Sequence, residues 1–406
     1  MPGQSPSLPI DVATERSITP GCASVAHLNN AGAALPTEAT LAVEIDHLRL
    51  EAQIGGYEAA VVVAGRLAAV RAGAAQLIGA QDDEVVLTGS DTQGWGRALW
   101  GFALGGGVAE GQRMLIDRIA YDSHYMALLQ VAEHWGATIE VVPSQNDGTV
   151  DLDALSAALS SGPVALCTTT HVGTHRGLVN PVEEMGVICR GAGVPFFVDA
   201  CQSAGQLPLD VETMGCDVLT ATGRKWLRGP RGTGFLYVRS DLAERMVPPG
   251  VGGDGAVWLD ADHLQYRPGT ERFVEFEIPV AAHLGLGAAI EHAAVLGIDT
   301  ISERVAGLAD QLRGLLRATD GVSEHDGGGR QAGIVSFTVD GVEPLVVKGA
   351  AAAAGINVSV TEAPAARLDM GGHRPTTTVR ASPHYYNTDE ELAALVEVLG
   401  EVSWGH

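Results

Sequence analysis

The sequence is poor in basic residues for its length. It has 25 Lys and Arg against 49 Asp and Glu among 406 residues, a formal net charge of −24. Binding to nucleic acid or to an anionic membrane needs a basic face, so this balance argues against both kinds of partner. We therefore interpret the acidity as that of an ordinary soluble surface.

Long hydrophobic runs and cysteine pairs are also lacking. No apolar run approaches the ~20 residues that span a bilayer, and the start, MPGQSPSLPI, has no charged region followed by an apolar one. We therefore expect a cytoplasmic protein. The five cysteines are odd in number and show no CxxC spacing, which favours buried thiols over a disulfide framework or a zinc site. They are Cys22, Cys167, Cys189, Cys201 and Cys216.

Strand-like and helix-like segments alternate through the first two thirds of the chain. This pattern predicts an α/β fold with a mainly parallel sheet flanked by helices and joined by right-handed crossovers. We expect an N-terminal arm over residues 1–30, loose to about residue 20. A large domain is expected over residues 31–275, and a smaller C-terminal α/β domain over residues 276–406.

The most informative stretch runs from residue 194 to 238. Asp199 closes the apolar run VPFFVD, and Lys225 follows the run DVLTA in TGRKW. Both then lie at the carboxyl edge of a parallel sheet, where open α/β sheets bind ligands. Burial and the neighbouring Arg224 favour the neutral amine of a lysine that forms a Schiff base, and a carboxylate there can keep a pyridine nitrogen protonated. A surface lysine and a capping aspartate are the simpler alternatives.

A second ligand-binding feature is expected at residues 88–92. The segment EVVLTGSDTQGWGRALWGFAL is typical of a strand, a polar turn and a helix that starts at the turn. A helix start of this kind presents free N–H groups to an anion.

Four segments together resemble one known family. VDACQ, TATGRKWLRGPRGTGFLYV, PGTERFVEF and VRASPHYYNTDEEL are similar to the class V aminotransferase, or cysteine desulfurase-like, family of fold-type I pyridoxal phosphate enzymes. The likeness extends from HLNNAG to the C-terminal helix. It implies pyridoxal 5'-phosphate as cofactor, an amino-acid substrate, no metal, and a homodimer with shared active sites.

The resemblance also implies roles for individual residues. Lys225 is the Schiff-base lysine, Asp199 contacts the pyridine nitrogen, Gln202 contacts the phenolic oxygen of the ring, and Arg380 clamps the substrate carboxylate. Phosphate contacts come from Thr92, Thr222 and Arg224, and Thr270 reaches the phosphate of the partner subunit. The cofactor-binding set is Asp91, Thr92, Tyr121, Thr174, Asp199, Gln202, Thr222, Arg224, Lys225 and Thr270.

The chain departs from the family pattern at several positions. Tyr121 stands where a ring-stacking histidine is common; it can stack and donate a proton, or it only packs. Thr174 stands where asparagine is common, and the following His175 and Arg176 either face substrate or form a solvated turn. Ser90 stands where glycine is common. The region GINVSVTEAPAARLDMGGH has no cysteine to accept sulfur, so persulfide chemistry is not expected.

Tyr121 and the missing cysteine favour β-elimination at a C–S bond, as catalysed by a carbon–sulfur lyase. HLNNAG, HVGTHRGLVNP and GINVSV are most similar to the ergothioneine-biosynthesis lyases of this family. That likeness implies cleavage of hercynylcysteine sulfoxide to ergothioneine through a sulfenic acid, with pyruvate and ammonia. Trp95, Trp258 and Asp91 are candidates to bind its trimethylammonium group. An isopenicillin N epimerase-like racemase, an aminotransferase and a catalytically silent binding protein remain open alternatives.

Overall fold

The computed structural model describes residues 9–371 and 374–404 and is built around a seven-stranded sheet with the order β2-β8-β7-β6-β5-β3-β4. Strands β3 to β7 are parallel to one another, and β8 is antiparallel to both of its neighbours. The strands are β2 (Val85–Thr88), β3 (Arg113–Ile116), β4 (Thr138–Val141), β5 (Val164–Thr170), β6 (Phe196–Asp199), β7 (Val218–Thr222) and β8 (Gly234–Val238). The predicted α/β architecture with a mainly parallel sheet is confirmed.

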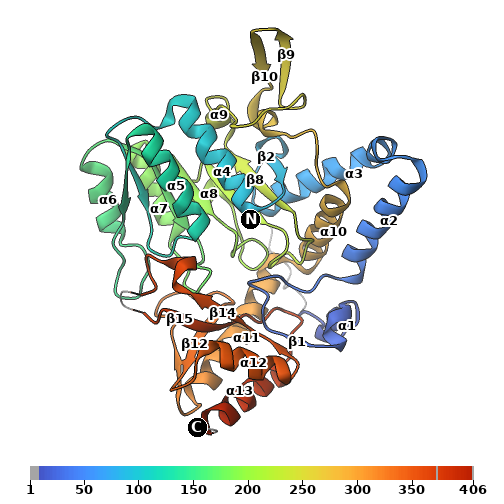
Figure 1. The fold of residues 1–406 in the computed structure, drawn as a ribbon, viewed down its shortest axis with the longest axis vertical. Coiled ribbons are helices and arrows are strands. Elements are labelled where there is room, and N and C mark those ends of the chain that lie inside the picture. Colours follow the sequence, from blue (N-terminus) through green and yellow to red (C-terminus); the bar gives the residue numbers. More distant parts are fainter. Residues whose placement is uncertain (1–8, 372–373, 405–406) are drawn as a thin grey trace, which may run out of the picture.

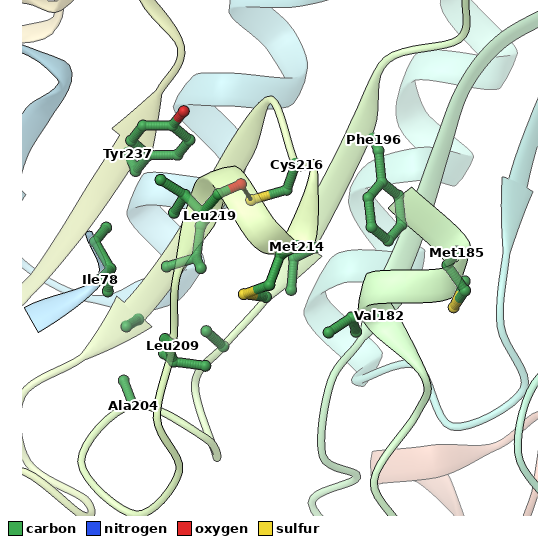
Figure 2. Close-up of a cluster of buried hydrophobic side chains, with 14 of the residues drawn as sticks. Ile78, Val182, Met185, Phe196, Ala204, Leu209, Met214, Cys216, Leu219 and Tyr237 are labelled. Atoms are coloured by element: carbon green, nitrogen blue, oxygen red, sulfur yellow. Dashed lines mark hydrogen bonds between the residues drawn. The ribbon is translucent and has the colours of Figure 1, made fainter. Parts of the chain in front are cut away.

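Helices cover both faces of this sheet because alternate strand residues point to opposite faces. Phe196 and Leu219 face one helical layer, whereas Phe197 and Val218 face the other. Figure 2 shows the first layer, where Met185 of α7 and Met214 of α8 lie close to Phe196 and Leu219. The helices of the large domain are α2 (Glu38–Ile54), α3 (Gly56–Leu77), α4 (Asp91–Phe102), α5 (Asp122–Trp135), α6 (Leu152–Ser160), α7 (Val182–Ala192), α8 (Val211–Met214), α9 (Ser240–Ala243) and α10 (Val280–Leu296).

A smaller domain lies below the large one in Figure 1 and contains a four-stranded sheet with the order β11-β12-β15-β14. Its elements are α11 (Ile298–Arg317), β11 (Val322–Glu324), β12 (Val335–Val339), α12 (Pro344–Ala353), β13 (Ile356–Asn357), β14 (Ser359–Glu362), β15 (Thr377–Ala381) and α13 (Asp389–Trp404). Helix α10 packs on α2 and α3, whereas α11 turns away from it by 83° and packs on the small sheet. We therefore propose the domain division at this bend rather than at residue 276.

The N-terminal segment is more ordered than the sequence suggested. Residues 1–8 lie outside the described residues, but α1 (Val12–Ser17) follows directly, with Asp11 capping its first turn. Arg16 pairs with Glu391 at 2.8 Å, and β1 (Ala26–His27) joins β13 in a parallel pair. A loose arm to residue 20 is therefore wrong for the described part, because a six-residue helix is too short to show a hydrophobic period.

Two features of the surface bear on assembly. Strands β9 (Ala256–Asp260) and β10 (His263–Tyr266) form a hairpin that projects from the large domain (Figure 1), and Trp258 on it is 79% exposed. Helix α3 is long and apolar enough to cross a membrane by length and composition, although Arg66 and Arg71 interrupt its apolar residues. In this structure α3 packs on α2 and α10.

The remaining short turns are η1 (Pro20–Ala23), η2 (Asp82–Glu84), η3 (Ala103–Gly107), η4 (Gly269–Phe273) and η5 (Ala363–Ala366).

All five cysteines are free thiols. Four are buried and Cys22 is half-buried, which confirms the expectation from their number and spacing.

Candidate active site

Asp199 at the carboxyl end of β6 and Lys225, which follows β7, lie close together, as the sequence predicted. We call this edge of the sheet, with Cys201, Gln202 and Arg380, the crevice. Both side chains are buried, with 3% and 7% of their surface exposed. Cys201 lies between them: the Lys225 amine is 3.2 Å from Cys201 Sγ, and the Cys201 backbone N–H donates to Asp199 Oδ1 at 2.8 Å. The ligand-binding edge of the sheet therefore presents a carboxylate at the end of β6 and an amine just after the neighbouring strand β7.

Gln202 forms the next wall of the crevice. Its side-chain amide donates to Ala31 O at 3.1 Å and to Thr174 Oγ1 at 3.3 Å. Its Oε1 accepts the indole N–H of Trp226 at 2.9 Å, which fixes the amide orientation. Gln202 and Thr174 thus lie together, as the expected set requires.

Arg380 reaches this wall from β15 of the small domain. Its guanidinium donates to Thr174 O at 2.7 Å and Thr174 Oγ1 at 3.2 Å, and a second nitrogen donates to Asn29 Oδ1 at 3.3 Å. Burial lowers the pKa of Arg380 to about 10, so the group is still a cation at neutral pH. Its buried Nε has no hydrogen-bond partner among the described residues.

The turn before α4 has the form expected for an anion site. The side chains expected to contact the phosphate, however, already have partners within the chain. Ser90, where glycine was expected, caps α4 by accepting the Gln93 N–H at 3.1 Å. The exposed Thr92 contacts Ser123 at 3.2 Å. Thr222 donates to Thr233 O at 3.1 Å, and Arg224 donates to Gly32 O at 2.7 Å.

Thr270 lies apart from this group. It is buried in η4, and its hydroxyl donates to Asp83 O of the same chain at 2.5 Å. Its predicted contact with the phosphate of a partner subunit therefore stays a prediction about the assembly.

Tyr121 directly precedes α5 and is half-buried. Burial and the neighbouring Asp122 raise the pKa of its phenol, which keeps the proton on the oxygen at neutral pH. Its ring meets that of His124 edge-on, with centroids 6.0 Å apart. Tyr121 can therefore serve as a proton donor at the crevice.

The sequence reasoning missed His124. This buried imidazole lies 2.9 Å from Asp91 Oδ2 and 3.3 Å from Asp199 Oδ2, and its ring stacks on Trp95 at 4.1 Å. The available signal was its position three residues after Tyr121, which places both side chains on one turn of a helix. Asp91 and Trp95 are therefore occupied by His124, and the third candidate for the trimethylammonium group, Trp258, lies on the projecting hairpin.

His175 and Arg176 are buried rather than part of a solvated turn. His175 Nε2 lies 2.7 Å from Asp369 Oδ2, and Arg176 Nε lies 3.0 Å from the same oxygen. Burial lowers the pKa of His175 despite this contact. Asp369 belongs to the small-domain segment after η5, so this segment closes on the wall that carries Thr174.

The donor set of this crevice fits pyridoxal phosphate. A buried amine whose hydrogen-bond partner is a thiol suits the aldehyde, and the carboxylate of Asp199 suits a protonated ring nitrogen. The start of α4 suits a phosphate group. Two buried nitrogen atoms at this site have no hydrogen bond within the described residues, namely Arg380 Nε and His124 Nδ1.

Comparison with known proteins agrees with this assignment. The sequence profile of the aminotransferase class-V family matches residues 26–395. A probable cysteine desulfurase of Methanothermobacter thermautotrophicus is 29% identical over 352 residues, 86% of each chain. A probable hercynylcysteine sulfoxide lyase of Mycobacterium tuberculosis is 31% identical over 374 residues, 92% of this chain and 89% of the relative. The apo structure of a cysteine desulfurase from Thermococcus onnurineus is 25% identical and superposes with a TM-score of 0.90, covering 98% of this chain and 100% of that one.

Proposed function

This chain belongs to the aminotransferase class-V family, and from that premise we propose that it is a pyridoxal phosphate-dependent carbon–sulfur lyase acting by β-elimination on a cysteine S-conjugate. One observation carries the choice of lyase over desulfurase. The small-domain segment that closes on the crevice brings the carboxylate of Asp369 to 2.7 Å from His175, and no cysteine follows Cys216 in the sequence. The segment therefore offers no thiol to accept sulfur.

Four residues of the crevice have tasks in this reaction. Pyridoxal phosphate, when bound, supplies an electron sink for negative charge at the substrate Cα. The amine of Lys225 binds the cofactor aldehyde and takes the Cα proton, and Asp199 accepts the hydrogen bond of the ring nitrogen. Arg380 orients the substrate carboxylate through a two-point contact. Tyr121 donates a proton to the departing sulfur group.

The overall step balances without an external oxidant. A proton leaves Cα, the C–S bonding electrons leave with sulfur, and the proton of Tyr121 goes to the leaving group. The remaining 2-aminoacrylate hydrolyses to pyruvate and ammonia. With a sulfoxide substrate the leaving group is a sulfenic acid, and its conversion to a thiol takes two electrons from an external thiol.

Hercynylcysteine sulfoxide is the substrate we propose. The support is the identity of 31% over 92% of the chain with the probable hercynylcysteine sulfoxide lyase, together with the motifs HLNNAG and HVGTHRGLVNP. The product is then ergothioneine, after reduction of the sulfenic acid.

A cytoplasmic homodimer is the assembly that we propose. Large apolar side chains are exposed on α2, α3 and the β9–β10 hairpin, and a dimer interface over these elements would remove them from water. They include Leu48, Tyr57, Val61, Val62 and Trp258. Light scattering after size exclusion should give twice the 42.0 kDa of the chain.

The test is a product analysis of the purified, cofactor-loaded enzyme. Incubation with hercynylcysteine sulfoxide should release pyruvate, detected with lactate dehydrogenase, and ergothioneine after addition of a thiol, detected by mass spectrometry. The thioether analogue measures the preference for sulfoxide, and Lys225→Ala is the inactive control.

Other outcomes point elsewhere. No pyruvate from any cysteine sulfoxide would overturn the proposal. Alanine and sulfide from free cysteine would indicate a desulfurase. Exchange of the Cα proton without elimination would indicate an epimerase, and accumulation of pyridoxamine phosphate an aminotransferase.

A further inference from the structure

His124 occupies a closed, charged position behind the crevice. It lies in the first turn of α5, while Asp91 begins α4 and Asp199 ends β6. One ring nitrogen is 2.9 Å from Asp91 Oδ2 and the other is 3.3 Å from Asp199 Oδ2. The three side chains are almost completely buried, with side-chain exposures of 2% to 5%. Two carboxylates therefore share one imidazole out of contact with water.

A doubly protonated ring is the form that suits this geometry. Nε2 makes a hydrogen bond with Asp91, whereas Nδ1 lies within ion-pair distance of Asp199 without a hydrogen bond. Only the imidazolium carries a proton on both nitrogens and a positive charge that both carboxylates attract. Burial alone would lower the pKa of His124, but the carboxylates of Asp199 and Asp91 raise it to about 10. Burial likewise opposes ionisation of Asp91, yet the charge of His124 lowers the pKa of this carboxyl group. The indole of Trp95 stacks on the His124 ring and restricts its orientation.

Other charges nearby do not replace His124. Lys225, which follows β7, acts on Asp91, but its amine contacts Cys201. Asp117, which follows β3, faces Asp199 with a further carboxyl group whose pKa burial raises to about 6. The neutral hydroxyl of Thr170 lies 3.2 Å from Asp199 Oδ2. His124 is thus the cation that contacts Asp199 among the described residues.

We propose that His124 is a positioning residue whose cationic ring pairs with the Asp199 carboxylate and holds it toward the ring nitrogen of pyridoxal phosphate, with Asp91 as the outer counter-charge. The inference rests on the cofactor part of the proposed function and is independent of the substrate. An ionised Asp199 accepts a hydrogen bond from a protonated ring nitrogen, whereas a protonated Asp199 leaves the proton off the ring. The cation beside Asp199 therefore sets where that proton resides.

The first test is nuclear magnetic resonance of the cofactor-free protein labelled with 15N-histidine. The wild type should keep one histidine with both ring nitrogens protonated at pH 8.5, where a histidine of ordinary pKa near 6.5 is neutral, and this signal should be missing in His124→Asn. His175 is the matched internal comparison, because it is also buried but faces one carboxylate, and its pKa is lowered. In Asp91→Asn, His124 should lose one ring proton at a lower pH than it does in the wild type. A neutral His124 at pH 7 in the wild type would overturn the proposal.

The second test follows the ring nitrogen of 15N-labelled pyridoxal phosphate bound to each variant. The wild type should show a protonated ring nitrogen at pH 7.5. His124→Asn should shift it toward the unprotonated form and weaken cofactor binding by about 10- to 100-fold, the loss typical when an outer partner of a ligand residue is removed. Asp91→Asn keeps both His124 and Asp199, and it should shift the protonation of the ring nitrogen in the same direction by a smaller amount. This variant tests the inference even if His124→Asn does not fold.

The outcomes separate this inference from the proposed function. If neither variant moves the ring-nitrogen signal, His124 is only structural and the inference fails, whatever the affinity does. Absence of cofactor binding in the wild type would overturn both. Normal ring-nitrogen shifts without pyruvate release would overturn only the lyase.

Discussion

Replacing Tyr121 with Phe tests the proposed proton donor directly. Phe keeps the ring that lies 6.0 Å from His124 and removes only the hydroxyl group. Because general acid catalysis contributes about 10²- to 10⁴-fold, we expect kcat for pyruvate release to fall by this factor, a rise of about 2.7–5.4 kcal/mol in the barrier. KM should change little, because Arg380 and the cofactor contacts remain in place. Coupled lactate dehydrogenase kinetics at pH 8 separate the two constants.

The dependence on the leaving group decides whether Tyr121 is a donor or only packs. A leaving group of low pKa needs little protonation, so the loss in Tyr121→Phe should shrink for activated thioethers such as S-nitrophenylcysteine. Burial and Asp122 raise the pKa of Tyr121 above its ordinary value of 10.0, so the wild type should show no alkaline loss of rate from this group below pH 10. A fall in kcat of less than about threefold, or an equal fall for every leaving group, would refute the role.

Three further predictions concern the clamp, the packing and the pH dependence of the fold. Arg380→Lys should raise KM about 10- to 100-fold in steady-state assays, because one ammonium replaces a planar guanidinium. The KM of the wild type should itself rise as pH approaches the Arg380 pKa of about 10. Gly186→Ala should lower the melting temperature and reduce the free energy of unfolding by about 1–3 kcal/mol, because the new Cβ would lie 1.9 Å from Met214 O. Gly191→Ala in the same helix is the control: its Cβ would have no atom within 4 Å, so the melting temperature should not fall. His124 has its pKa raised from 6.5 to about 10 on folding, so it stabilises the apo-protein fully below pH 6.5 and loses this effect as pH rises through about 10. The melting difference between the wild type and His124→Asn should shrink over that window, and a constant difference would contradict this.

The convergence of Asp199 and Lys225 could be predicted because both depend on one local rule. Each follows a buried parallel strand, and the carboxyl ends of parallel strands share one edge. The alternation of strands and helices in the sequence predicts which residues lie at that edge without any knowledge of their contacts. The same rule does not extend to His124, whose importance depends on the packing of α5 against α4.

Other differences arise where a pattern is too short or too ambiguous. Helix α1 has six residues, fewer than two turns, so no hydrophobic period could reveal it. His175 and Arg176 are polar residues in a glycine-flanked segment, which is typical of exposed turns. Their burial depends on Asp369, distant in the sequence, and that long-range ion pair leaves no local signal.

The pairing of the two ends of the chain has a consequence for how the protein is made. Asn30 donates to Ser382 O at 2.7 Å across 352 residues, and Asn29 and Gly32 accept hydrogen bonds from Arg380 and Arg224. At about 5–20 residues per second, the ribosome needs roughly 20–70 s to add the partner strand after Asn30 has been synthesised. During that time the central sheet can form while the N-terminal wall of the crevice stays unpaired. Synthesis of β15 is then the event that completes the crevice, and loss of this strand would disable residues made about 350 positions earlier.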